Sequence, residues 1–456
     1  MFSKEAQTAT KMPRFTWPIN FDSMRAYRLH WNQFLCIMSF IVLVGSISSV
    51  DAATTNLQNC FTGSFDASVD LFPVKSSVRF AKSFTIEYFK SYKTITENGR
   101  VFVLYQCGTP QPTGNFPSNT KFFSVPISSA AVGATTDVTF LEAFGAGPSI
   151  VAVDNTYTTP TSACVIQRIN NGMIKSFGGY NLSSADVLFD SSASNNNNIS
   201  IYASTEPTPL ARTETIKLFA AFYNAEDKAA QFFNNTLNNY NCWKSKVNST
   251  ASRPVIAFVN YYDGEWSIPQ SGFKPGLVAD AGGQLAGLST TYTDLPSLVA
   301  DLNARGVDIV IDESYFLDGL PSLDMVLANY GLNSSNYTSQ RWGKNIYRVD
   351  GQITSSYSFD WFDGGQVFAD AVLNDFMNII NSSLPTPSYK RVWIRSIYNE
   401  TPKVYNPNDC KDYSQPTLSP SPTCTVQNSN NSSAVSLMHV GVLHVAALLL
   451  AVVSLI

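Results

Sequence analysis

Apolar and polar residues alternate in short runs along the first half of the chain, which predicts strands separated by brief helices. The pattern FTIEYF at 84–89 has the period of two expected of a half-buried strand, and VFVLYQ at 101–106 is bounded by a Gly-Thr-Pro turn. Further strands are expected at 91–96, 122–128, 149–155, 186–190 and 199–204, and a helix at 135–144. Strands that alternate with helices indicate an α/β lobe.

A different period begins after residue 207. Thr208-Pro209 reads as an N-cap followed by proline in the first turn, and apolar residues then recur every three or four positions from Ile216 to Tyr240. This spacing predicts one helix of about 30 residues, or roughly 45 Å.

Strand and helix patterns resume from Pro254, which predicts a second α/β lobe. Strands are expected at 254–262, 307–314, 345–350 and 391–398, and helices at 296–305, 323–330 and 365–380. The predicted fold class is therefore α/β, with two Rossmann-like α/β lobes joined by a single long helix and flanked by a signal peptide and a GPI-signal tail.

The N-terminal region carries a secretion pattern. An apolar run at 34–45 follows Arg25 and Arg28 and precedes small residues, which predicts cleavage after Ala52 or Ala53. Met24 directly precedes the basic residues, so we treat it as a candidate start. The alternative is an uncleaved type II membrane anchor.

The C-terminal region carries a second processing pattern. The apolar tail 440–456 follows a short spacer and the small residues Asn431, Ser432 and Ser433, where we expect GPI attachment. A simple membrane span is the alternative. The expected organisation is a signal peptide at 1–53, an N-terminal lobe at 54–206, an inter-lobe helix at 207–250, a C-terminal lobe at 251–400, a Ser/Thr/Pro/Asn-rich stalk at 401–433 and the GPI signal at 434–456.

Composition narrows the possible chemistry. Charged residues make up 14% of the 456-residue chain and the net charge is −4, which excludes a basic nucleic-acid-binding domain. The only histidines, His30, His439 and His444, lie in the segments expected to be removed, so nucleophile relays that use histidine are excluded and histidine metal ligands are absent from the mature region. We expect no metal site, no cofactor and no catalysis.

Cysteines and sequons both indicate an extracellular chain. Six cysteines remain after Cys36 is removed, which favours disulfides; among the many possible connectivities we expect Cys60–Cys242, Cys107–Cys164 and Cys410–Cys424. Glycosylation is expected at eight N-x-S/T sites: Asn181, Asn198, Asn234, Asn248, Asn333, Asn336, Asn381 and Asn399. The cell surface, as GPI-anchored plasma membrane or cell wall, is the expected location.

Five motifs, taken in order, resemble the class III periplasmic solute-binding proteins of siderophore, cobalamin and metal-ion importers, in an anchored, secreted eukaryotic branch. The motifs are SSADVLFDSS (183–192), the inter-lobe segment 204–233, ADAGGQ (279–284), GVDIVIDES (306–314) and the closing helix 364–380. The resemblance implies a ligand held between two lobes. Tyr223-Asn224 departs from the family's usual glycine, and eukaryotic anchoring puts transport coupling in doubt.

Polar and aromatic side chains follow the predicted strands at the edge where such a ligand would lie. Carboxylates and aromatic rings together suit a sugar, a polyol or a cationic metal complex. The candidate ligand-binding residues are Thr135, Thr136, Tyr157, Tyr261, Tyr262, Trp266, Asp312, Glu313, Tyr315 and Trp361.

The sequence thus predicts a cell-surface protein that captures a small ligand, such as a siderophore or metal complex, without catalysis. Its expected partners are that ligand, the outer membrane leaflet through the GPI anchor and, as a further candidate, cell-wall glycans. Two alternatives remain: a structural wall glycoprotein with a degenerate cleft, and a wall glycosidase that uses carboxylates among Asp263, Glu265, Asp312 and Glu313.

Overall fold

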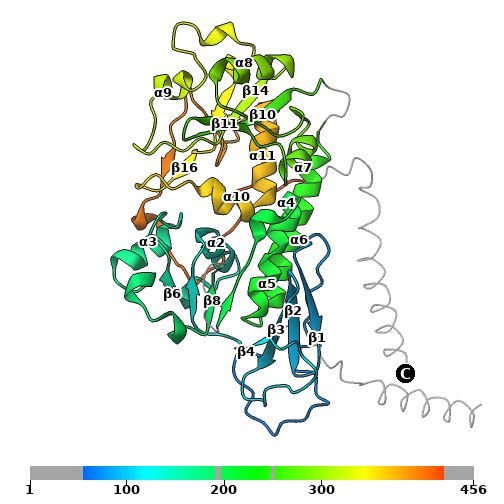
Figure 1. The fold of residues 1–456 in the computed structure, drawn as a ribbon. Coiled ribbons are helices and arrows are strands. Elements are labelled where there is room, and N and C mark those ends of the chain that lie inside the picture. The colour runs from blue at the N-terminus through cyan, green and yellow to red at the C-terminus, as the bar shows by residue number, and fades with distance from the viewer. Residues whose placement is uncertain (1–54, 191–196, 248–251, 426–456) are drawn as a thin grey trace, which may run out of the picture. The chain divides into compact units, whose positions relative to one another are not determined.

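Four sheets organise the part of the chain that the computed structural model describes, which is residues 55–190, 197–247 and 252–425 (Figure 1). The signal peptide, the Asn248 sequon, the GPI attachment residues and the apolar tail lie outside these ranges. Within them, no helix is long and apolar enough to cross a membrane.

The first sheet comes from the alternating strands near the N-terminus. Its order is β1-β2-β3-β4, with antiparallel pairs except between β3 and β4. The strands are β1 (Phe84–Tyr88), β2 (Tyr92–Glu97), β3 (Arg100–Gln106) and β4 (Lys121–Val125). Residues 54–206 therefore contain this separate sheet in addition to the expected α/β lobe.

The second sheet is parallel throughout and forms the first α/β lobe. Its order β7-β6-β5-β8-β9 places the first strand in the centre, as in doubly wound folds. Helices α2 (Thr135–Ala143) and α3 (Ala163–Asn170) follow β5 and β6. The strands are β5 (Ala130–Val132), β6 (Ile150–Val153), β7 (Lys175–Ser176), β8 (Val187–Phe189) and β9 (Asn198–Ile199). Every residue of β5 and β8 is buried, as expected for parallel strands covered on both faces.

The third sheet forms the second α/β lobe, so the prediction of two α/β lobes is confirmed. Its order is β13-β11-β10-β14-β15-β17, and β12 also pairs with β10. The strands are β10 (Val255–Tyr262), β11 (Glu265–Ile268), β12 (Gln284–Leu285), β13 (Thr290–Tyr292), β14 (Ile309–Asp312), β15 (Ile346–Arg348) and β17 (Arg395–Ser396). Its smaller helices are α7 (Lys274–Asp280), α8 (Leu295–Ala304) and α9 (Leu323–Ala328).

The connection between the lobes is helical, but the prediction of a single helix is wrong. It consists of α4 (Pro209–Glu214), α5 (Ile216–Ala221) and α6 (Glu226–Lys244). Thr208 caps α4 as predicted, because its side chain accepts a hydrogen bond from the Ala211 amide. The path breaks at Asn224, whose φ of 52° is left-handed and whose side chain donates to Leu57 O and Gln106 Oε1.

Three buried glutamates attach the N-terminal segment to this connection. Glu214 accepts hydrogen bonds from the backbone amides of residues 79–81, and Glu206 accepts those of residues 82 and 83. Glu226 forms an ion pair with Lys93 of β2, and both side chains are fully buried. A buried carboxylate needs such donors because its desolvation is costly.

Two helices replace the predicted closing helix. They are α10 (Gly364–Val367) and α11 (Ala369–Ile380), and α11 packs along α6 (Figure 1).

The prediction of an extended stalk is wrong for its described part, residues 401–425. This segment packs back onto both lobes, and we call it the strap. It begins with β18 (Lys403–Val404), which pairs with β16 (Gln352–Ile353). Thr417 N then donates to Glu142 O in α2, and Ser419 Oγ to Asp370 in α11.

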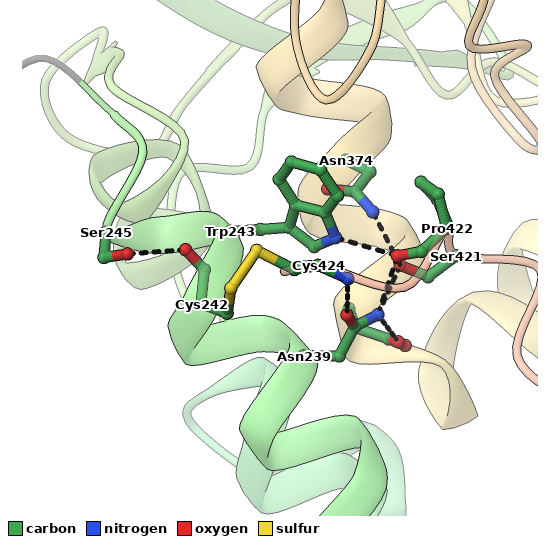
Figure 2. Close-up of a disulfide and its surroundings, with 9 residues drawn as sticks. Asn239, Cys242, Trp243, Ser245, Asn374, Ser421, Pro422 and Cys424 are labelled. Atoms are coloured by element: carbon green, nitrogen blue, oxygen red, sulfur yellow. Dashed lines mark hydrogen bonds between the residues drawn. A yellow bond between two sulfur atoms is a disulfide. The ribbon is translucent and has the colours of Figure 1, made fainter. Parts of the chain in front are cut away.

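The six cysteines are all paired, as expected, but the predicted connectivity is wrong. The bonds are Cys60–Cys107, Cys164–Cys410 and Cys242–Cys424. The proximity of Cys410 and Cys424 in sequence was misleading, because the strap runs from α3 to α6 and places each cysteine against a different helix. Figure 2 shows the Cys242–Cys424 disulfide, beside which Trp243 Nε1 donates to Pro422 O at 2.9 Å.

Six of the predicted glycosylation sites are exposed: Asn181, Asn234, Asn333, Asn336, Asn381 and Asn399. Asn198 is different, since it is 6% exposed and its amide nitrogen donates to Asp190 O at 3.3 Å. That nitrogen would carry the glycan, so the folded chain argues against modification at Asn198.

The strap gives a stability prediction. Replacing Cys164 and Cys410 together by serine should lower the free energy of unfolding by about 2–4 kcal/mol, because the unfolded chain is then less constrained. Limited proteolysis should show early cleavage between residues 405 and 417. The matched variant lacking Cys60–Cys107 should leave the strap protected, and equal strap cleavage in both variants would contradict this role.

Candidate functional site

The loops at the carboxyl ends of the strands in the two α/β lobes meet at a hydrogen-bonded boundary. Thr135 and Thr136 begin α2 in the first lobe. Thr135 Oγ1 donates to Asp363 Oδ1 at 2.7 Å, and Thr136 Oγ1 donates to Phe362 O at 2.7 Å. Both predicted residues therefore lie at the boundary, but their hydroxyls bind the opposite lobe.

A second set of bonds comes from the loop that follows β6. Thr161 Oγ1 lies 2.7 Å from Asp360 Oδ1 and 2.7 Å from Asp363 Oδ2. Thr159 N donates to Ser358 Oγ at 3.0 Å. Segment 358–363 of the second lobe is thus held by two separate loops of the first.

Asp360 joins three parts of the chain at this boundary. Besides Thr161, its carboxylate accepts hydrogen bonds from Trp393 Nε1 at 2.8 Å and Tyr405 Oη at 3.1 Å. Tyr405 belongs to the strap, so one buried side chain links the first lobe, the second lobe and the strap. Such a fully bonded buried carboxylate fixes local geometry.

Four carboxylates are buried close together here: Asp137, Glu142, Asp360 and Asp363. Burial raises the pKa of Glu142 to about 7, against the effect of the Ser162 hydroxyl, with Asp360 adding to the rise. Burial likewise raises the pKa of Asp363 to about 7, although Thr161 donates to it. Burial also raises the pKa of Asp137 well above its usual value, and Asp363 and Asp190 raise it further.

The facing charges are mainly of one sign. The positive charge of Arg168 acts against this rise and lowers the pKa of Glu142. The Arg168 guanidinium donates a hydrogen bond to Gly147 O at 2.8 Å and lies 4.6 Å from the Tyr413 ring centroid. Crowded buried carboxylates favour their protonated forms at neutral pH. The boundary therefore has a strongly negative character only when these groups ionise.

Aromatic rings lie beside the acids on the second lobe. Tyr315 packs against Tyr357 and Phe359 with ring centroids 5.7 and 5.6 Å apart, and Phe359 stacks on Phe362 at 6.2 Å. Tyr315 is 47% exposed and Phe362 48% exposed. The predicted residue Tyr315 thus offers an accessible ring next to the inter-lobe bonds.

Tyr157 lies on the loop after β6 and is 93% exposed. It comes two residues before Thr159, which bonds the second lobe. Its ring is available to solvent at the rim of the boundary.

The predicted hairpin residues form a separate aromatic pair. Tyr261 and Trp266 are cross-strand neighbours with ring centroids 4.7 Å apart, and Tyr262 is exposed. Tyr261 N donates to Ser314 Oγ at 2.9 Å, which brings the ends of β10 and β14 together. Trp266 Nε1 donates a hydrogen bond to Asn329 O at 2.9 Å.

Three predicted ligand-binding residues are engaged in ion pairs or in the core and are not available to a ligand. Asp312 is fully buried, pairs with Arg348 at 2.5 Å and accepts from Tyr330 Oη at 2.6 Å. Glu313 pairs with Lys274 at 2.6 Å. Trp361 is 4% exposed and packs against Phe273 and Phe376, so its ring belongs to the core.

Sequence reasoning missed the acids and rings around Trp361. The segment SFDWFDGG carries Asp360, Asp363, Phe359 and Phe362, all of which lie at the boundary. Two aspartates spaced by three residues, next to aromatic residues and a Gly-Gly pair, were the available signal.

Metal ligands are a separate matter. Among residues 55–190, 197–247 and 252–425, no group of three or more His, Cys, Asp or Glu side chains is arranged to hold a metal ion. The acids at the boundary instead accept hydrogen bonds from hydroxyl, backbone amide and indole groups.

Cavities of substantial volume lie elsewhere in the described chain. One of about 550 Å³ separates α6 from the strap, one of about 390 Å³ lies beside Tyr223 and Lys228, and one of about 330 Å³ lies beside Asp308 and Arg341.

The buried acids predict a pH dependence of stability. The folded-state pKa values of Glu142 and Asp363 are raised to about 7 from 4.5 and 3.8, so folding favours their protonated forms. Their contribution is complete below about pH 4 and is lost as pH rises through about 7, by roughly 3–4 kcal/mol per group.

Urea unfolding between pH 4 and 8 measures this dependence. Glu142→Gln should flatten the fall in stability between pH 5 and 8, whereas Glu87→Gln, at an exposed site on β1, should leave it unchanged. A curve for Glu142→Gln that overlays the parent curve would contradict the assignment.

The Asp312–Arg348 pair yields a stability prediction of its own. Asp312→Asn should cost about 3–5 kcal/mol in the free energy of unfolding, because Arg348 would remain buried with a weakened partner. Lys75→Ala, which breaks the exposed Lys75–Asp70 pair, should cost about 1 kcal/mol or less. If both variants unfold like the parent chain, Asp312 has no structural role.

Comparison with known proteins gives structural likenesses only. No protein-family model matches the chain, and no curated protein sequence matches it. A periplasmic binding protein from Veillonella parvula aligns at 11% identity with a TM-score of 0.44, covering 66% of this chain and 98% of that protein.

Two further solved structures are of the same kind. A periplasmic heme binding protein from Pseudomonas aeruginosa aligns at 12% identity and TM-score 0.41, covering 60% of this chain and 99% of its own. An Fe3+-hydroxamate transport protein from Saccharomonospora viridis aligns at 11% identity and TM-score 0.41, covering 63% and 98%. These solved structures are of the class that the sequence motifs resemble; with TM-scores below 0.5 they carry no conclusion about what this chain binds.

Proposed function

We propose that this chain is a solute-binding protein that captures a small ligand at the boundary between its two α/β lobes, without catalysis. One observation carries the proposal: loops at the carboxyl ends of both sheets meet through side-chain bonds, such as Thr135–Asp363, beside the accessible rings of Tyr315 and Phe362. Ligands of α/β folds bind at this edge of their sheets.

The side chains suggest the chemistry of the ligand. Tyr315, Phe362 and Tyr157 offer ring faces that can stack on a planar solute and make cation–π contacts with a positively charged one, whereas the neighbouring acids Asp137 and Asp363 are buried and favour their protonated forms. A siderophore or another metal complex with a planar or cationic surface meets both requirements.

The proposed setting is the cell surface, with the chain secreted, glycosylated and held by a GPI anchor. Three disulfides and six exposed sequons among the described residues support an extracellular environment. The signal and anchor segments remain sequence-based predictions.

The two alternatives differ in their support. A glycosidase requires two available carboxyl groups, but Asp312 is bonded to Arg348 and Glu313 to Lys274, which leaves only Asp263 and Glu265 of the four candidates, on the exposed hairpin of β10 and β11. A structural wall glycoprotein agrees with the strapped, hydrogen-bonded boundary, so it is the competing proposal to test.

A thermal-shift series separates them. The folded chain is titrated with a ferric trihydroxamate siderophore, hemin and cobalamin, and at about 100 times Kd one of them should stabilise it by about 2.7 kcal/mol. Tyr315→Ala combined with Phe362→Ala should abolish that shift. Phe89→Ala, which removes a partly exposed ring from the segment joining β1 to β2, should preserve it.

Each outcome has a definite meaning. A shift lost only in the double variant supports the lobe boundary as the binding site. A shift that survives in the double variant, or no shift with any probe, overturns the proposal, and the second result favours the structural glycoprotein.

A further inference from the structure

The cavity between α6 and the strap lies apart from the lobe boundary and has a different chemistry. Its volume is about 550 Å³, within the usual range for small-molecule sites. Its lining comes from α6, from Asp370 in the first turn of α11, and from residues 418–424 of the strap.

One wall of the cavity is fixed by a hydrogen-bonded network. Asn239 Nδ2 donates to Asp370 Oδ2 at 2.8 Å and Ser421 Oγ at 2.8 Å, and its Oδ1 accepts from Cys424 N at 2.7 Å. The Cys242–Cys424 disulfide closes the same wall (Figure 2). The site is therefore preformed, which lowers the cost of binding.

The same network removes free charge from the cavity. Asp370 is the only charged residue in the lining, and its second oxygen accepts from Ser419 Oγ at 2.8 Å. With both oxygens bonded and the side chain buried, Asp370 offers little to an incoming cation. A neutral ligand fits these surroundings best.

Helix α6 also offers unused hydrogen-bonding groups to the cavity. Asn235 and Asn238 are exposed, lie three residues apart on the same face of α6, and form no side-chain hydrogen bond with any residue that the structure describes. Thr236 and Thr423 add hydroxyl groups. Amides and hydroxyls both donate and accept, as sugar hydroxyls require.

Phe232 supplies an apolar face at the same site. Its ring is half-buried and packs against Phe368 with centroids 5.7 Å apart. A ring beside free amides and hydroxyls, without free charge, matches the alternating apolar and polar surfaces of a pyranose.

We propose that this cavity binds a neutral saccharide unit. Two sources share this chemistry: a separate oligosaccharide, or the glycan expected on Asn234 of the chain itself. Asn234 is exposed, directly precedes Asn235 and lies one helical turn before Asn238, so a glycan attached there starts at the rim of the cavity. The proposal is independent of the ligand at the lobe boundary.

The test uses the full secreted chain and N,N′-diacetylchitobiose, a neutral disaccharide, as the probe. The Asn234→Gln chain, which lacks the local glycan, should bind the probe by calorimetry. Asn235→Ala combined with Asn238→Ala should weaken binding by about tenfold or more, since two amide contacts are lost. Asn241→Ala, an exposed asparagine of α6 outside the lining, should leave binding unchanged.

The glycosylated parent chain distinguishes the two sources. If its own glycan occupies the cavity, the parent chain should bind the probe only after endoglycosidase treatment, and Asn235→Ala with Asn238→Ala should speed removal of the Asn234 glycan. If the ligand is separate, the glycosylated chain should bind the probe directly. Absence of probe binding to the Asn234→Gln chain, or binding that survives the double substitution, overturns the proposal.

Discussion

The arrangement of the chain depends on carboxylates that are buried within the helical connection between the lobes or just before it. Glu206, Glu214 and Glu226 would be strongly destabilising if left without donors, and each finds them in the segment before or within the first sheet. The positions of residues 79–83 and of Lys93 are therefore set by the need to pair these three carboxylates. These bonds join the N-terminal sheet to α4 and α6; we call this joined unit the frame, and both α/β lobes are connected to it.

The strap acts on the same frame from the other end of the chain. It is bonded to α3 through Cys410 and to α6 through Cys424, while Tyr405 reaches Asp360 at the lobe boundary. Separation of the lobes would have to break the bonds of Thr135 and Thr161 and deform this covalent loop. A ligand at the boundary must therefore be admitted by small rearrangements of side chains and loops.

Two regions with different electrostatics emerge from this frame. At the lobe boundary, crowded acids such as Glu142 and Asp363 lie beside accessible rings, so that region changes character with pH. In the cavity beside α6, Asp370 is the one acid of the lining and is fully hydrogen-bonded, and the free groups are amides and hydroxyls. The first suits a cationic or planar solute and the second a neutral, hydroxyl-rich one.

Local sequence determined the α/β class, most strand positions and the capped start of α4, because periodicity and capping depend on neighbouring residues. It also marked Thr135, Thr136 and Tyr315, since residues after parallel strands meet at one edge of a sheet. Only the tertiary structure decided the break at Asn224, the disulfide pairs and the structural roles of Asp312 and Trp361. These depend on donors, sulfur atoms and rings that are distant in sequence, such as Arg348 beside Asp312, and no local pattern specifies them.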